Sequence, residues 1–186
     1  KLAEAGKRIE PNYGISKLCN GKLTLSKNCS PSDMPQVLLW GDSFAMHLYQ
    51  GIVASNASLK IHQVTKSSCS PILDLSRFSI LANKGHDWAS ECIDFNDKVF
   101  EWLLNNNQVE FVILSSPFGW VGRDKMIDKD GVIYKPNIKT VLNKFAKTIK
   151  RINSAGVGVV VVSPTPKSGK NNGDCLIKKY LFDNKI

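Results

Sequence analysis

The sequence of 186 residues has no apolar run that approaches the roughly 20 residues that a membrane-spanning helix requires. Its longest apolar run, VGVVVVS at residues 157–163, has the length of a strand. The Cys-x-x-Cys and His-x-x-x-His spacings of zinc sites are absent, and so are the glycine-rich phosphate loops of nucleotide-binding proteins. We therefore expect neither a metal nor a cofactor, and we expect any membrane or targeting segment to lie outside these residues.

The charge is unbalanced, with 25 Lys and Arg against 16 Asp and Glu and a formal net charge of +9. Such an excess favours acidic partners, for example anionic glycans, lipid headgroups or nucleic acid. The lysines are spread along the whole chain, however, without a dense arginine cluster or the interleaved aromatic and basic residues of nucleic-acid modules. We therefore expect no nucleic-acid partner, and the simplest interpretation of the charge is a solvated, lysine-rich surface.

Five cysteines suggest a disulfide framework. Cys19 and Cys29 bracket a short polar segment, and Cys69 and Cys92 bracket a serine-rich one. We expect a Cys19–Cys29 and a Cys69–Cys92 disulfide and an extracytoplasmic location; the alternative is five free thiols in a reducing compartment. Cys175 is then left over, and its partner is expected beyond Ile186.

Residues 1–35 are rich in Pro, Gly and Asn, which favours an irregular, disulfide-tied lead-in or linker extension ahead of a domain at 36–186. Within that domain, apolar runs alternate with segments of helical spacing. The predicted strands are 36–40, 59–65, 109–116 and 158–164, and the predicted helices are 43–55, 91–106, 138–153 and 175–182. Residues 66–90, 117–136 and 164–175 are predicted to be loops, with a small hairpin at DKDGVIY, residues 128–134.

Three of the four strands are continuous apolar runs separated by helices, whereas 59–65 shows alternation. This pattern predicts a mostly parallel sheet covered on both faces, an α/β/α three-layer sandwich. Functional groups in such sheets gather at the carboxyl ends of the strands. The loops that leave those ends are 41–43, 66–90, 115–136 and 163–175, and they are rich in Gly, Ser, Pro and Trp.

Ser43 follows a buried strand and opens a helix, in the run QVLLWGDSFAMHL. Backbone N–H groups at a helix start are unpaired and carry the positive end of the helix dipole. A serine there can attack a carbonyl while those N–H groups hold the oxyanion. The alternative is a plain turn in which Ser43 only caps the helix. The Gly-x-Ser-x-Gly elbow of α/β-hydrolases does not fit, because Ala45 stands at the second glycine.

The run LLWGDSFAMHL resembles the first signature block of the SGNH (GDSL-like) hydrolase superfamily. Further runs resemble the SGNH domain that is fused to acyltransferase-3 membrane proteins, which O-acylate bacterial surface glycans. They are NYGISKLC, QVTKSSCSP, ECIDFNDKVFEWL, VILSSPFGW and SPTPKSGKNNGDCL. The resemblance covers about residues 12–180, and its specificity comes from the order and spacing of these runs.

The resemblance implies that Ser43 is the nucleophile and that its N–H is one oxyanion donor. The glycine of the second block is absent, and Ser68 is the candidate for that backbone donor. The third block lacks its asparagine, and we expect Asn96 to tie down structure instead. Trp120 is a candidate for stacking on a sugar ring, with a packed loop tryptophan as the alternative.

The family supplies its acid and base from a C-terminal Asp-x-x-His, and Asp183-Asn184-Lys185-Ile186 does not match it. Among the three histidines, His47 lies one helical turn after Ser43, His62 lies in a strand and His86 lies in a loop. We expect that the chain stops short of the last strand, the C-terminal helix and the Asp-x-x-His; the alternative is an inactive domain.

The resemblance thus predicts the extracytoplasmic or periplasmic domain of an O-acyltransferase, tethered to the inner membrane through segments outside this sequence. It would move an acyl group, expected to be acetyl, from a donor delivered by a membrane acyltransferase domain to a surface glycan through an acyl-serine. The alternatives are a freestanding SGNH carbohydrate esterase and an inactive glycan-binding accessory domain.

Overall fold

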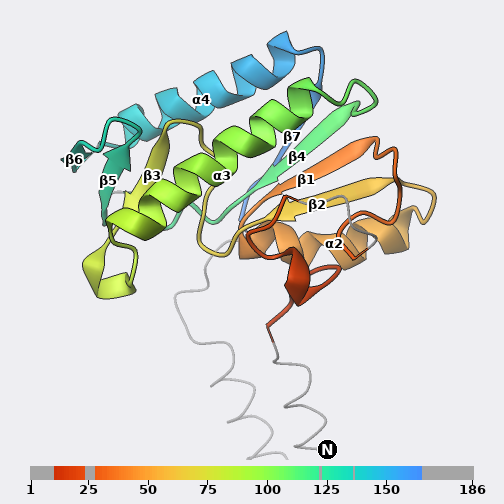
Figure 1. Ribbon diagram of the computed structural model, residues 1–186, viewed down its shortest axis with the longest axis horizontal. Coiled ribbons are helices and arrows are strands. Elements are labelled where there is room, and N and C mark those ends of the chain that lie inside the picture. Colours follow the sequence, from red (N-terminus) through yellow and green to blue (C-terminus); the bar gives the residue numbers. More distant parts are fainter. Residues whose placement is uncertain (1–10, 24–27, 122, 136, 165–186) are drawn as a thin grey trace, which may run out of the picture.

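Four parallel strands form the central sheet of the computed structural model, which describes residues 11–23, 28–121, 123–135 and 137–164 (Figure 1). In spatial order they are β2 (Ile61–Thr65), β1 (Val37–Gly41), β4 (Phe111–Ser115) and β7 (Gly158–Val162). All residues of β1 and β2 are buried, because both faces of this half of the sheet are covered. The predicted parallel sheet is confirmed.

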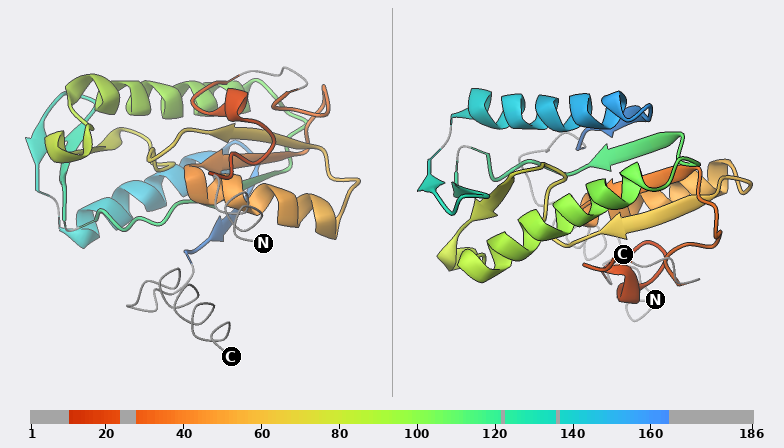
Figure 2. Two further views of the ribbon diagram at one scale, coloured as in Figure 1. Left: turned by 90° about the horizontal axis from the view of Figure 1, so that it is seen from below. Right: turned by 45° about the horizontal axis from the view of Figure 1, so that its top comes forward.

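Helices cover the sheet on both faces (Figure 2). They are α2 (Ser43–Ser55), α3 (His86–Leu104) and α4 (Ile138–Ser154). Helix α2 packs on one face against Leu39 and Ile61, whereas α3 and α4 pack on the other face around Trp40 and Leu114. The predicted α/β/α three-layer arrangement is therefore confirmed, and the start of α2 agrees with the sequence pattern.

A second, antiparallel sheet lies beyond the carboxyl ends of the parallel strands (Figure 1). It consists of β3 (Leu75–Phe78), β5 (Lys125–Asp128) and β6 (Ile133–Tyr134). The prediction of a loop throughout 66–90 is wrong, because this segment holds β3, the short helix η2 (Ile80–Ala82) and the first turn of α3. The strand was missed because its partner β5 lies some fifty residues later in the chain; the predicted hairpin corresponds to β5 and β6.

The described part of the lead-in packs along β2 and contains the short helix η1 (Lys17–Cys19). The Gly21 N–H donates to the Thr65 carbonyl at 2.7 Å, and the Gln63 side chain donates to the Tyr13 carbonyl at 2.9 Å. This packing explains why 61–65 is buried at every position although its sequence alternates. The predicted loop 164–175, the helix 175–182 and Cys175 lie outside the described residues, apart from Pro164.

Candidate active site

Three chain segments meet at the carboxyl edge of the sheet. In register, Gly41 at the end of β1 lies between Thr65 of β2 and Ser115 of β4. The Lys66 N–H donates to the Gly41 carbonyl at 3.0 Å, and the Asp42 N–H donates to the Ser115 carbonyl at 3.3 Å. The segments that follow the three strands therefore start side by side.

Gly41 allows β1 and β4 to approach closely at this edge. A Cβ at this position would lie 2.0 Å from the Ser115 carbonyl oxygen and 2.9 Å from the Ala45 Cβ. Backbone atoms and a packed helix cannot move aside cheaply, so only glycine fits here. The glycine thus permits the sharp passage from β1 into α2 that presents Ser43.

Ser43 is the first residue of α2, and Asp42 is its N-cap. The Asp42 Oδ1 accepts the Phe44 N–H at 2.9 Å, so the acid rather than Ser43 caps the helix. Ser43 is half-buried, and in the described part of the chain its hydroxyl makes no hydrogen bond. The serine hydroxyl is therefore left available at the positive end of the helix dipole.

The carboxyl group of Asp42 is buried. Burial raises the pKa of Asp42 from 3.8 to about 6. Hydrogen bonds from the Phe44 N–H, the Ser116 hydroxyl and the Asp42 N–H lower the pKa, but they do not offset the effect of burial. No ion pair with Asp42 is formed within the described residues. A strongly shifted acid beside a candidate nucleophile is typical of functional sites.

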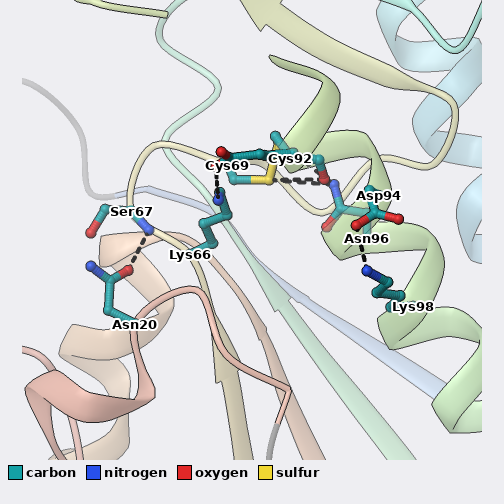
Figure 3. A network of polar contacts seen from close by, with 9 residues as sticks. Asn20, Lys66, Ser67, Cys69, Cys92, Asp94, Asn96 and Lys98 are labelled. Carbon is teal, nitrogen blue, oxygen red and sulfur yellow. Dashed lines mark hydrogen bonds and ion pairs between the residues drawn. A yellow bond between two sulfur atoms is a disulfide. The ribbon is translucent and has the colours of Figure 1, made fainter. Parts of the chain in front are cut away.

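The loop that follows β2 places Ser68 in a glycine-like conformation. Its φ is +65°, and the turn is closed by the Cys69 N–H, which donates to the Lys66 carbonyl at 3.0 Å. The preceding Ser67 N–H donates to the Asn20 Oδ1 at 2.8 Å (Figure 3). The Ser68 N–H has no hydrogen-bond partner among the described residues. These features leave the Ser68 N–H unengaged in the described residues, and its role as a backbone donor in place of the missing glycine stays a prediction.

The same loop is fixed to α3 by a disulfide and an asparagine (Figure 3). The structure contains both predicted disulfides, Cys19–Cys29 and Cys69–Cys92. The buried Asn96 amide donates to the Ser70 carbonyl at 2.9 Å and accepts the Trp40 indole N–H at 2.9 Å. Asn96 therefore ties the core to the loop, in agreement with its predicted structural role.

Sequence reasoning missed two buried serines, Ser70 and Ser116. The Ser116 hydroxyl donates to the Asp42 Oδ2 at 2.8 Å and lies 2.7 Å from the Ser70 hydroxyl. Trp120 donates its indole N–H to the Ser70 oxygen at 3.0 Å. Both serines stand in loops that the sequence singled out, but nothing in their local sequence distinguishes them from neighbouring serines.

Trp120 is only 5% exposed and packs against Ile72 and Met126. This burial favours the alternative of a packed loop tryptophan over a role in sugar stacking.

None of the three histidines forms a hydrogen bond with Ser43. His47 is exposed on α2 beside Phe44, and His86 at the start of α3 has its ring 5.1 Å from Phe78. His62 is buried in the middle of β2, and burial lowers its pKa to about 4. The described residues therefore provide no histidine base for Ser43, and the expected Asp-x-x-His stays a prediction.

The described residues contain no cluster of three or more His, Cys, Asp or Glu side chains that could hold a metal ion. No helix among these residues is long and apolar enough to cross a bilayer.

Comparison with known proteins identifies the family. The family model described as "SGNH domain (fused to AT3 domains)" matches residues 16–185. Searches of curated proteins and of solved structures give no match. The matched range includes all the elements that form the carboxyl edge of the sheet, and the parallel α/β fold agrees with it. The chain therefore belongs to the family of SGNH domains that are fused to AT3 domains.

Proposed function

We propose that this SGNH domain is the extracytoplasmic part of an O-acyltransferase that acylates a bacterial surface glycan, with Ser43 as the acyl carrier. The observation that carries the proposal is the place of Ser43: it opens α2 one residue beyond the end of β1, after the cap Asp42, with its hydroxyl unengaged in the described residues. The family's fusion to AT3 domains supports a membrane acyltransferase domain as the partner that delivers the acyl group. The two disulfides support an oxidising compartment such as the periplasm.

In the proposed reaction, the Ser43 Oγ attacks the carbonyl carbon of the acyl donor. The N–H groups of Ser43 and Ser68 hold the oxyanion, the bond to the leaving group breaks, and an acyl ester forms on Ser43. A glycan hydroxyl then attacks this ester, takes the acyl group and regenerates the Ser43 hydroxyl. Both steps need a proton acceptor, and the predicted Asp-x-x-His would supply it.

A catalytically inactive glycan-binding accessory domain is the second candidate. One specific observation supports it. All three histidines of the sequence lie in the described residues, and none of them forms a hydrogen bond with the Ser43 hydroxyl. Without a base, a serine hydroxyl at neutral pH is a weak nucleophile.

The test measures turnover of p-nitrophenyl acetate by the full-length protein, with and without a sugar acceptor. The variant is Ser43→Ala, and the matched control is Ser55→Ala, which removes an exposed hydroxyl from the other end of α2. We expect turnover to fall by at least about a thousandfold in Ser43→Ala and to be retained in Ser55→Ala. In the wild-type protein, mass spectrometry should find an acetyl group on the peptide that contains Ser43.

Equal turnover in wild type and Ser43→Ala would refute the assignment of the nucleophile. Sugar binding without any Ser43-dependent turnover would support the accessory domain. Release of acetate with no acetylated sugar, across a panel of acceptors, would support the esterase alternative.

A further inference from the structure

Four buried polar side chains at the carboxyl edge form a continuous chain of hydrogen bonds. It runs from the Trp120 indole N–H to Ser70 (3.0 Å), from Ser70 to Ser116 (2.7 Å) and from Ser116 to Asp42 (2.8 Å). The members come from three segments: Asp42 lies between β1 and α2, Ser70 lies in the loop after β2, and Ser116 and Trp120 lie in the loop after β4. Ser116 is 0% exposed. We refer to these four residues as the Asp42 chain.

The direction of this chain follows from the chemistry at its two ends. An indole nitrogen can only donate, and an ionised carboxylate can only accept. Ser116 therefore gives its single hydrogen to Asp42, so the bond between the two serines must be donated by Ser70. Ser70 in turn accepts from Trp120. With an ionised Asp42, every hydrogen of the chain has one acceptor.

Protonation of Asp42 leaves a hydrogen without an acceptor, and which one depends on the oxygen that takes the proton. If the proton sits on Oδ2, Asp42 donates to Ser116 and Ser116 donates to Ser70. Ser70 then accepts from both Ser116 and Trp120, and its own hydrogen has no acceptor in the chain. If the proton sits on Oδ1, Ser116 can still donate to Oδ2, but the new hydrogen has no acceptor in the chain and Oδ1 is weakened as the cap of α2. A buried polar group without its partner is costly in either case.

We propose that Asp42 is a positioning residue for Ser43: through Ser116 and Ser70, its carboxylate locks the loops after β2 and β4 onto the start of α2. The lock fixes Ser43 relative to the loop that carries Ser68, and all of its hydrogen bonds are satisfied only while Asp42 is ionised. This inference rests on the proposed role of Ser43 as nucleophile.

No charged side chain among the described residues competes for this carboxyl group. Burial and hydrogen bonds account for the raised pKa of Asp42, and no charged side chain contributes to it. On α2, His47 is exposed beside Phe44; in the loop after β2, the Lys66 ammonium pairs with Glu91 at 3.1 Å. The groups that face the carboxyl from β4 and from the loop are the uncharged serines.

A test that does not depend on activity follows the indole N–H signals of the four tryptophans by two-dimensional NMR. The Trp120 signal is identified by its loss in Trp120→Phe. In wild type it should shift with a midpoint near pH 6, where Asp42 titrates. The shift should vanish in Asp42→Asn and in Ser70→Ala. A Trp120 signal that does not titrate in wild type, or that titrates equally in Asp42→Asn, would overturn the chain.

The activity test compares Ser116→Ala with Ser115→Ala. Ser115 is the matched control, because it is the adjacent buried hydroxyl and bonds only to the Val162 carbonyl in the described residues. We expect Ser116→Ala to lower kcat about 10- to 100-fold with little change in KM, because the reacting groups are misplaced while binding is kept. The acid limb of its kcat/KM profile should move to higher pH, and Ser116→Thr should restore both.

The outcomes separate the two proposals. Retained turnover in Ser43→Ala refutes the proposed nucleophile, whatever the Trp120 signal does. An inactive Ser43→Ala together with a Ser116→Ala that matches Ser115→Ala in kcat and pH profile refutes only the positioning role of Asp42. Urea unfolding of both serine variants confirms that folded proteins are compared.

Discussion

His62 should make the protein less stable in mild acid, and its replacement by Phe should remove this effect. The ring is 0% exposed, its Nδ1 lies 3.2 Å from the Cys29 carbonyl, and it packs 5.0 Å from the Trp102 ring. Because a carbonyl only accepts, Nδ1 carries a proton, and the lowered pKa of His62 keeps Nε2 unprotonated at neutral pH. Its Nε2 has no hydrogen-bond partner among the described residues. Protonation would therefore place an unpaired charge in the core.

The magnitude follows from the pKa of His62, which burial lowers from 6.5 to about 4. Between these values the unfolded chain binds more protons than the folded one, so the free energy of unfolding rises with pH. The destabilisation is absent above pH 6.5 and complete below pH 4. At 1.36 kcal/mol per pKa unit, it amounts to about 3 kcal/mol.

The assay is urea unfolding of wild type and His62→Phe at intervals from pH 4 to pH 7.5. At pH 7.5 the two should agree within about 1 kcal/mol, because the Cys29 carbonyl still accepts the Gln63 N–H at 3.1 Å. Towards pH 4 the variant should become the more stable protein by about 3 kcal/mol. His47→Phe, on the exposed face of α2, is the control and should run parallel to wild type. Parallel curves for His62→Phe and wild type would refute the burial argument.

Three further predictions concern the carboxyl edge. Asp42 has a raised pKa of about 6, so between pH 3.8 and 6 the folded state binds more protons than the unfolded chain and the free energy of unfolding falls as pH rises. Over this interval the free energy of unfolding of Asp42→Asn should rise by about 3 kcal/mol relative to that of wild type. Urea unfolding that shows a constant difference between the two proteins would contradict this prediction. The Cys69–Cys92 disulfide closes a sequence separation of 23 residues, and its reduction should lower the free energy of unfolding by about 3 kcal/mol. Alkylation of the unfolded protein without reductant should leave both cysteines unlabelled. Gly41→Ala places a Cβ 2.0 Å from the Ser115 carbonyl, so we expect loss of cooperative unfolding by circular dichroism, and a wild-type transition would show that β1 and β4 can separate at this edge.

Much of the fold was predictable because its signals are local. The β1–α2 boundary follows from an apolar run, a glycine and the polar pair Asp42-Ser43 within seven residues. Helix α4 follows from the spacing of its apolar residues. The antiparallel sheet was not predictable in the same way, because β3 is four residues long and, within the described residues, pairs only with β5. Short strands carry little periodic signal, and their pairing depends on loops that the sequence does not place.

The sequence by itself determined the family, the parallel sheet, both disulfide pairs and the position of Ser43 at the start of a helix. These depend on residue type and on spacing along one stretch of chain. Only the tertiary structure decided that Asp42, rather than Ser43, caps α2, that Trp120 is buried, and that Ser70 and Ser116 join Asp42. The hydrogen bonds of the Asp42 chain connect residues 46 to 74 positions apart. Which hydroxyls meet across such separations is set by strand order and register, because neighbouring parallel strands bring their carboxyl ends to one edge.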